Sequence, residues 1–408
     1  MAESIEKEKL ALIAAACRLG RRELCEAILT LKTHEVHLMD NTQLYSQRLE
    51  RVNAAVACTH ADRIPFMPSV RSYPYVRNGH SMGEAMNDLS LAQQDLKDFV
   101  LALEPDMAVS YTASLAGAGD AMTEMGVSLL EWPGRVGGTL DNNGVTQIIE
   151  DPPMEEDDYE DLSSLLSLLP HYDFTLPKAT AYRAAARQFE QELAAMGFPT
   201  AYNAIAAAPF DVLGLCLRGT LGLMTDIYMY EDEVCEALEL LLPHILDHAV
   251  AQAAQSAGRF VYVPLKNGME GYLSLEQYED FYFPTVKKLC EGLIAKGLTP
   301  LLYCEGPYSS RLEILNELPE KQCVIRLDSA DMPKAKAVLG KTHCLSGGFY
   351  AYDLVHSTPE AIREYLKFLL DTMGDGGGYI FDFGDRLDSA KSENLEAMME
   401  TFRDCAIY

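Results

Sequence analysis

Residues that could carry acid–base, anion-binding or metal chemistry stand near the ends of short apolar segments in this 408-residue chain. Carboxyl groups in such places can hold or transfer a proton, and guanidinium groups can hold an anion. We predict that Glu305, Arg311 and Asp328 are catalytic, with Arg311 bracing the Glu305 carboxylate through a charge-assisted hydrogen bond. The side chains predicted to contact a substrate are Arg71, Tyr73, Tyr75, Asn203, Lys266, Tyr303 and Ser346.

A metal site is a more specific interpretation of the same region than acid–base catalysis. Cys304, Glu305, Asp382 and Asp385 would supply one thiolate and several carboxylates, and zinc accepts carboxylate oxygen beside thiolate sulfur. The alternative is a buried, inert Cys304 next to a carboxylate that hydrogen-bonds the substrate. The residues alone leave both interpretations open.

The elements that must position these residues are eight short apolar segments, most of them followed by a helical pattern. They span 64–70, 107–112, 200–206, 260–264, 300–304, 323–327, 343–347 and 379–383. Continuous apolar strands separated by helices predict parallel strands buried on both faces. Eight such units predict an α/β fold of the closed (β/α)8 type, the TIM barrel, whose active sites form at the C-terminal ends of the strands. An open doubly wound sheet is the competing architecture, but PSVRSYPYVRNG at 68–79 is not the Gly-rich turn it would carry.

Two parts of the chain lie outside the predicted barrel units. Residues 1–45 form an N-terminal helical extension, ahead of a barrel domain over 46–408, and a helix is predicted at about 42–58. A long excursion over about 113–199 separates the second and third strands. It contains a predicted hairpin, GVSLLEWPGR followed by GTLDNNGVTQIIED, and the acidic run EDPPMEEDDYED at 150–161, which is typical of a solvated loop.

Composition restricts the partners and the cellular setting. The chain has 33 Lys+Arg against 61 Asp+Glu, a formal net charge of −28, so nucleic acid and anionic membrane surfaces are poor partners. There is no signal-peptide pattern and no apolar run of membrane-spanning length. The ten cysteines contain no CxxC pair. These features predict a cytoplasmic protein with reduced thiols.

Three segments resemble the uroporphyrinogen decarboxylase superfamily. RLERVNAAVACTHADRIPF at 48–66 resembles its opening, and LSLEQYEDFYFPTVKKLCEGLIAKGLTPLLYCEG at 273–306 resembles its fourth-helix and fifth-strand signature. The segment from KTHCLSGGFYAYDLV at 341 to the end follows its last two β/α units. The resemblance covers about 46–408. It implies a (β/α)8 barrel that performs either porphyrinogen decarboxylation or zinc-dependent methyl transfer involving a corrinoid or a thiol.

The chain departs from the decarboxylase branch at that branch's functional motifs. The branch carries an Arg-Gln-Ala-Gly-Arg-Tyr type motif after strand one, of which this chain keeps Arg71 and Arg77 only. The branch also has a catalytic Asp at the end of strand two, where this chain reads VSYTASLAGAGD with no Asp close to the strand. A polycarboxylate substrate would therefore lack its usual Arg clamp, and decarboxylation its usual acid.

The chain departs from the methyltransferase branch as well. That branch ligates zinc with His-x-Cys on strand five and a second Cys at strand eight. Here Leu302 replaces the His and Cys304 is kept, while the region of Asp382 and Asp385 replaces the second Cys. The complete zinc site of the branch is therefore absent.

Methyl transfer is nevertheless the leading functional hypothesis, mainly because the decarboxylase motifs are missing, and also because charge near the predicted site is balanced. The cations there are Arg71, Arg77, Lys266, Arg311, Arg326 and Arg386, and the carboxylates are Glu270, Glu305, Asp328, Asp382 and Asp385. A near-neutral site with tyrosines suits a small methylated substrate or acceptor better than a polyanion. The alternatives are a uroporphyrinogen decarboxylase-type lyase and a non-catalytic barrel that acts as a binding protein.

The resemblance implies zinc, and a corrinoid carried by a partner protein, as cofactors. The partners we expect are therefore a small-molecule substrate and a corrinoid protein. The sequence leaves open whether the N-terminal helices contact that protein or form a homodimer.

Overall fold

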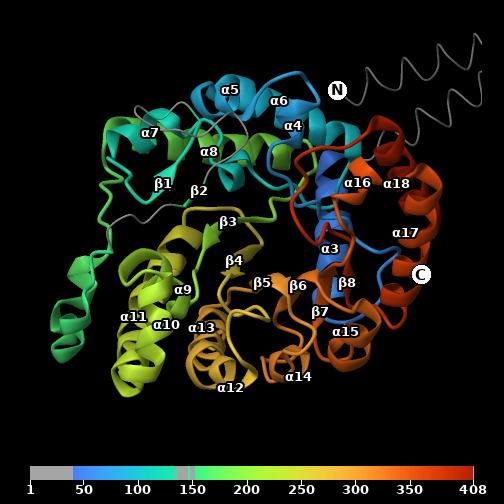
Figure 1. The fold of residues 1–408 in the computed structure, drawn as a ribbon. Helices are drawn as coiled ribbons and strands as arrows, with labels where there is room; N and C mark the ends of the chain where they lie inside the picture. The colour runs from blue at the N-terminus through green and yellow to red at the C-terminus, as the bar shows by residue number, and fades with distance from the viewer. Residues whose placement is uncertain (1–39, 134, 136–145, 148–151, 408) are drawn as a thin grey trace, which may run out of the picture.

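The computed structural model describes residues 40–133, 135, 146–147 and 152–407 (Figure 1). Residues 1–39 of the predicted N-terminal extension, and most of the second arm of the predicted hairpin, lie outside the described residues. The described chain opens with α3 (Asn41–Val56), close to the predicted helix at 42–58. The Asp40 side chain caps it by accepting a hydrogen bond from the Thr42 N–H.

Six parallel strands form one sheet in sequential order. They are β3 (Tyr202–Ile205), β4 (Phe260–Leu265), β5 (Pro300–Pro307), β6 (Val324–Ser329), β7 (Cys344–Gly347) and β8 (Tyr379–Ile380). All six were predicted as strands from their apolar runs. A separate antiparallel pair, β1 (Leu130–Glu131) with β2 (Thr146–Gln147), joins the two arms of the predicted hairpin.

The first two predicted strands close the ring between β8 and β3, although they form only single bridges. The Met67 N–H donates to the Phe381 carbonyl at 2.9 Å, and the Asp106 N–H donates to the Phe66 carbonyl at 2.8 Å. The Ala201 N–H then donates to the Ala108 carbonyl at 2.8 Å. Pro65 and Pro68 have no N–H, which prevents a continuous ladder in the first segment. The predicted (β/α)8 barrel is confirmed, with two of its eight strands irregular.

Helices surround the strands on the outside (Figure 1). The longer ones are α6 (Leu89–Leu103), α8 (Pro177–Ala195), α10 (Thr220–Met229), α11 (Glu231–Ala253), α13 (Phe283–Ala295), α15 (Met332–Leu339), α17 (Pro359–Gly374) and α18 (Ser392–Cys405). The shorter ones are α4 (Tyr73–Val76), α5 (Met82–Asn87), α7 (Gly119–Glu124), α9 (Pro209–Val212), α12 (Leu275–Gln277), α14 (Leu312–Leu315) and α16 (Asp353–His356). The described residues also contain irregular helical turns: η1 (Tyr111–Ser114), η2 (Glu156–Glu160), η3 (Leu162–Leu168), η4 (Leu213–Leu217) and η5 (Tyr278–Tyr282). None of the described helices is long and apolar enough to cross a membrane.

Strand side chains separate into two buried clusters. One cluster contains residues such as Val263, Leu302 and Leu345 together with residues of the outer helices. The other contains alternate strand residues such as Leu301 and Val324 and no residue of the outer helices. Because successive side chains of a strand point to opposite faces, the second cluster is the barrel interior.

The helix α3 closes the N-terminal end of this interior. Its residues Val52, Ala55 and Val56 belong to the interior cluster. Arg51 of the same helix forms ion pairs with Asp62 and with the buried Asp106, which anchor it there. The opposite, C-terminal end of the strands is therefore where a site can form.

Candidate active site at the C-terminal ends of the strands

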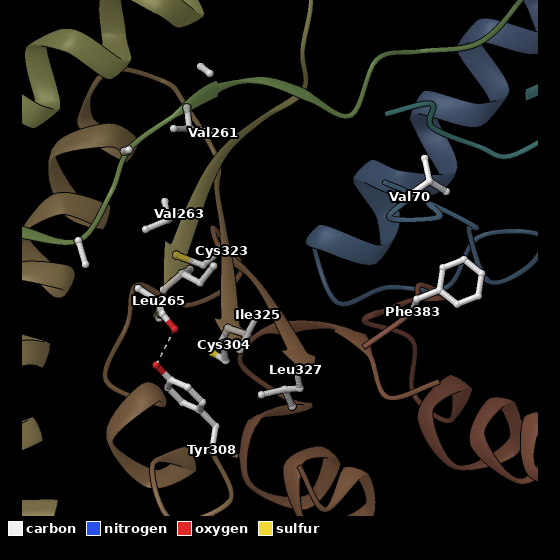
Figure 2. Close-up of a cluster of buried hydrophobic side chains, with 14 of the residues drawn as sticks. Val70, Val261, Val263, Leu265, Cys304, Tyr308, Cys323, Ile325, Leu327 and Phe383 are labelled. Carbon is white, nitrogen blue, oxygen red and sulfur yellow. Dashed lines mark hydrogen bonds between the residues drawn. The ribbon is translucent and has the colours of Figure 1, made fainter. Parts of the chain in front are cut away.

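Strand β5 places two predicted site residues on opposite faces. Tyr303 belongs to the interior cluster, whereas Cys304 belongs to the outer cluster. Figure 2 shows Cys304 among Leu265, Ile325 and Leu327, on the helix side of the strands. Glu305 follows the same alternation as Tyr303, so its carboxylate points to the interior side.

Three tyrosines from neighbouring strands stack inside the barrel. Tyr202 of β3 and Tyr262 of β4 have ring centroids 4.7 Å apart, and Tyr262 and Tyr303 of β5 have centroids 6.0 Å apart. We call these three residues the tyrosine stack. The Arg326 guanidinium extends it, with Cζ 4.2 Å from the centroid of the Tyr303 ring. Both faces of Tyr303 are therefore covered, one by Tyr262 and the other by Arg326.

Arg326 of β6 is almost completely buried and is fixed by the loop after β8. Its Nε donates to the Phe383 carbonyl at 3.1 Å, and its Nη2 donates to the carbonyls of Gly384, at 3.2 Å, and of Asp385. A Cβ on Gly384 would lie 2.6 Å from the Asp328 carbonyl oxygen, so glycine allows these two segments to approach. This close approach brings the carbonyls within reach of Arg326.

Asp382 is the counter-ion of Arg326. Its Oδ2 lies 3.2 Å from Arg326 Nε. It also accepts hydrogen bonds from the Ser69 N–H at 2.6 Å, the Ser69 hydroxyl at 2.8 Å and the Phe383 N–H at 2.7 Å. Complete burial raises the pKa of Asp382 to about 6, against the opposing effect of Arg326 and these hydrogen bonds. Asp382 is thus ionised at neutral pH, and its oxygens are already occupied.

Asp328 lies within electrostatic reach of two further carboxyl groups, Glu305 and Asp385. Asp328 Oδ2 accepts from the Gly306 N–H at 2.9 Å, and Asp385 Oδ1 accepts from the Ala351 N–H at 2.8 Å. Burial and the neighbouring Glu305 raise the pKa of Asp328, and burial and Asp328 raise the pKa of Asp385. This cluster can therefore hold a proton more readily than exposed carboxylates can.

Three buried polar atoms on adjacent strands have no hydrogen-bond partner among the described residues. They are Glu305 Oε2 on β5, Arg326 Nη1 on β6 and Ser346 Oγ on β7. Arg326 and Ser346 are direct partners in the β6–β7 register. Leaving such groups unpaired is costly, so their arrangement is typical of a site completed by a bound molecule. We call these residues, with Tyr303, Asp328, Asp382, Asp385 and Arg386, the barrel mouth.

The four residues predicted to hold zinc do not come together as a set of ligands in the described part of the chain. Cys304 faces the helices, and burial raises the pKa of its thiol, whereas a zinc ligand must be a thiolate. The oxygens of Asp382 are taken by Ser69, Phe383 and Arg326. Within the described ranges, no three His, Cys, Asp or Glu side chains lie together in a way that could hold a metal ion. The predicted metal set therefore gains no support from the described residues and stays a prediction, whereas the alternative of a buried Cys304 fits them.

Arg311 does not brace Glu305. Its Nη2 donates to the Leu273 carbonyl at 2.5 Å, and its Nη1 donates to the Ser310 hydroxyl at 2.9 Å. Its Cζ lies 5.1 Å from the centroid of the Tyr278 ring. The guanidinium is buried on the helix side of the barrel, where it holds the loop after β4. The predicted hydrogen bond between Arg311 and Glu305 is thus not formed among the described side chains, and a shared catalytic role stays a prediction.

The predicted substrate contacts of the first loop are also structural. Arg71 forms a bidentate ion pair with Asp388, with Nε 2.8 Å from Oδ1, and so joins the first strand to the loop after β8. Tyr73 is buried edge-on against Phe99. The Tyr75 hydroxyl, also buried, bonds the Ser114 hydroxyl at 3.0 Å.

Asn203 and Lys266 lie outside the barrel mouth. Asn203 accepts from the Thr112 hydroxyl at 2.8 Å and faces a groove of about 320 Å³ between α8 and α11. The backbone N–H of Lys266 donates to the buried Asp211 at 2.9 Å, and the ammonium group of Lys266 lies within electrostatic reach of Asp211 and Cys216. The structure therefore brings together six of the predicted residues at the barrel mouth: Tyr303, Glu305, Asp328, Ser346, Asp382 and Asp385. The contacts of Arg71, Tyr73, Tyr75, Asn203, Cys304 and Arg311 lie elsewhere.

Sequence reasoning missed part of the mouth. Tyr202 and Tyr262 were not predicted, although a tyrosine on each of three successive strands is a usable signal. Arg326 and Arg386 were predicted only as part of the balanced charge near the site, and not as substrate contacts. The Arg386 guanidinium lies within electrostatic reach of Glu305 and of the tyrosine stack, and it forms no ion pair with any described residue.

Comparison with known proteins agrees with this architecture. A sequence model of the family described as uroporphyrinogen decarboxylase (URO-D) matches residues 47–405. Uroporphyrinogen decarboxylase from Psychromonas ingrahamii (strain DSM 17664 / CCUG 51855 / 37) is 28% identical over 149 residues, which are 36% of this chain and 41% of that relative. The match thus spans about two fifths of the curated relative.

A solved structure, a methyltransferase from Methanosarcina mazei, superposes with a TM-score of 0.64 at 13% identity, over 87% of this chain and 97% of that chain. At this identity the likeness shows a shared fold.

Proposed function

Because this chain belongs to the uroporphyrinogen decarboxylase family, we propose that it is an enzyme of the family's methyl-transfer kind. It would move a methyl group from a small methylated substrate, bound in the barrel mouth, to a corrinoid carried by a separate protein. The observation that carries this proposal is the charge and shape of the mouth: a floor of stacked tyrosines with few cations.

A polycarboxylate porphyrinogen needs several converging Arg or Lys side chains to replace its hydration. In the described part of the mouth the cations are Arg326 and Arg386, and Arg326 is already paired with Asp382. Arg71, which the decarboxylase branch would use as an anion clamp, is paired with Asp388. The mouth therefore favours a small ligand with at most one or two anionic groups.

The carboxyl groups of the mouth would act by donating a proton to the substrate. Methyl transfer from a heteroatom breaks the carbon–heteroatom bond, and the bonding electron pair stays on the heteroatom. The corrinoid, when bound, would supply the electron pair for the new bond to the methyl carbon, and the heteroatom would take up a proton. Asp328, whose pKa burial and Glu305 raise, supplies this proton. Glu305, with its unpartnered Oε2, accepts a hydrogen bond from the substrate.

Uroporphyrinogen decarboxylation is the competing function, since the curated relative has that name. That match covers 36% of this chain, and the mouth lacks the converging cations that the substrate would require. A non-catalytic barrel is the third candidate. Its lack of any turnover distinguishes it from both enzymes.

The test is an assay of the purified full chain with small O-methyl and N-methyl compounds as methyl donors. Free cob(I)alamin serves as the methyl acceptor and is followed by its absorbance. We expect enzyme-dependent formation of methylcobalamin with at least one donor, and no conversion of uroporphyrinogen supplied in a parallel reaction. Stoichiometric decarboxylation of uroporphyrinogen without methyl transfer would overturn the proposal, as would the absence of both reactions.

A further inference from the structure

We propose that the substrate of the barrel mouth carries a carboxylate, and that Arg326 Nη1, Ser346 Oγ and the Arg386 guanidinium bind it. This inference rests on the proposed function and adds to it the chemical class of the substrate. It assigns a binding role to three side chains, only one of which the sequence had indicated as a substrate contact.

The Nη1 atom of Arg326 carries two N–H donors that form no hydrogen bond with the described residues. Nε and Nη2 share one edge of the planar guanidinium, and both face the carbonyls of Phe383, Gly384 and Asp385. Nη1 therefore lies on the other side of the group, away from that loop, and has no partner among the described residues. The side chain is only 1% exposed and its plane is held against Tyr303, so Nη1 cannot turn to water.

Ser346 lies next to this nitrogen donor along the sheet. Its Cα is the register partner of the Arg326 Cα on the adjacent strand, and both side chains point into the barrel. Ser346 is fully buried and its hydroxyl is unpartnered within the described chain. A guanidinium N–H and a rotatable hydroxyl on neighbouring strands match the two oxygens of one carboxylate.

Arg386 supplies the second positive charge. It follows β8 on the loop that binds Arg326, lies within electrostatic reach of the tyrosine stack and of Glu305, and makes no ion pair with any residue in the described ranges. Asp382 neutralises Arg326. Arg386 is therefore the charge that balances a bound anion, which would otherwise be expensive to bury.

The location of the anion also orients the rest of the substrate. The proposed carboxylate site lies on β6, β7 and the loop after β8, while Glu305 is on β5 and Asp328 is at the end of β6. A small acid held at its carboxylate would extend toward these two carboxyl groups. Its methylated heteroatom would then reach the proton donor.

The test is direct binding, because it does not need turnover. Isothermal titration of the full chain compares matched pairs that differ only in charge, such as methoxyacetate with methoxyacetamide and dimethylglycine with its amide. The titrations use near-physiological salt, which screens the acidic net charge of the protein. We expect the acids to bind at least about tenfold more tightly than the amides, the size of one charge-assisted hydrogen bond.

Two variants and one control make the test specific. Arg386→Gln should remove the preference for acids with little change in stability, since no ion pair joins Arg386 to another described residue. Ser346→Ala should weaken acid binding several-fold while stability is unchanged or higher, because a buried unpaired hydroxyl is removed. Arg403→Gln, the same substitution on the exposed face of α18, should change neither.

Equal binding of acids and amides would overturn the inference, and so would an unchanged preference in Arg386→Gln. A loss of stability in Ser346→Ala with unchanged acid affinity would also contradict it. If acids bind as expected but no methyl transfer to cob(I)alamin occurs, the carboxylate site stands and the proposed function fails.

Discussion

Replacing Asp328 by Asn should lower turnover by about 10²- to 10⁴-fold, the usual contribution of a general acid, while the protein stays folded. Asn is nearly isosteric, and its side-chain oxygen can still accept the hydrogen bond that the Gly306 N–H donates to Asp328 at 2.9 Å. The variant therefore removes the proton and keeps the contact. Steady-state kinetics with the best methyl donor, beside thermal unfolding, measures both effects.

The pH dependence of kcat should show whether Asp328 is the group that donates the proton. Burial and Glu305 raise the pKa of Asp328, and the protonated form is the active one. In the wild type, kcat should therefore fall as pH rises through the pKa of Asp328, and Asp328→Asn should lose this dependence. Asp404→Asn, on the exposed part of α18, is the matched control and should keep both rate and profile. If Asp328→Asn turned over at the wild-type rate, Asp328 would not be the general acid.

Replacing Arg326 by Met should destabilise the protein by about 3–5 kcal/mol, because it leaves the buried Asp382 without its counter-ion. The same change removes the donors that hold the Phe383, Gly384 and Asp385 carbonyls and the predicted contact to the substrate carboxylate. We expect acid binding to be lost as well. Urea unfolding and titration with methoxyacetate measure the two effects separately.

A double variant separates charge from packing. If the cost arises from an unpaired Asp382, Arg326→Met with Asp382→Asn should recover part of the lost stability, while acid binding stays absent. Asn retains an oxygen for the hydrogen bonds from Ser69 and Phe383. Equal stability of the single and double variants would show that the ion pair is not what Arg326 contributes.

The strands and the barrel could be predicted because apolar runs and helical periods are local properties. The face on which each strand residue points was also available from the sequence. Cys304 and Glu305 are neighbours on one strand, and successive side chains alternate, so they could not share a site inside the barrel. This alternation separates Cys304 from Glu305 within the predicted metal set.

The partners of the charged residues could not be predicted, because they are distant in sequence. Arg71 pairs with Asp388, 317 residues away, and Arg326 binds carbonyls of a loop almost 60 residues away. Arg311 is satisfied by carbonyls and a ring near 270–278, which only the folded chain brings to it. The tertiary structure therefore determines which arginines stay available for a ligand. Arg386 stays available, whereas Arg71 does not.

The most direct test of this account measures methyl transfer against zinc content in the same samples. Wild type and Cys304→Ala are treated with a chelator, analysed for metal, and assayed with the best methyl donor and cob(I)alamin. If the proton of Asp328 activates the leaving group, both proteins will transfer methyl at the untreated rate with far less than one zinc per chain. A rate that rises in proportion to bound zinc, and that Cys304→Ala abolishes, would contradict the account.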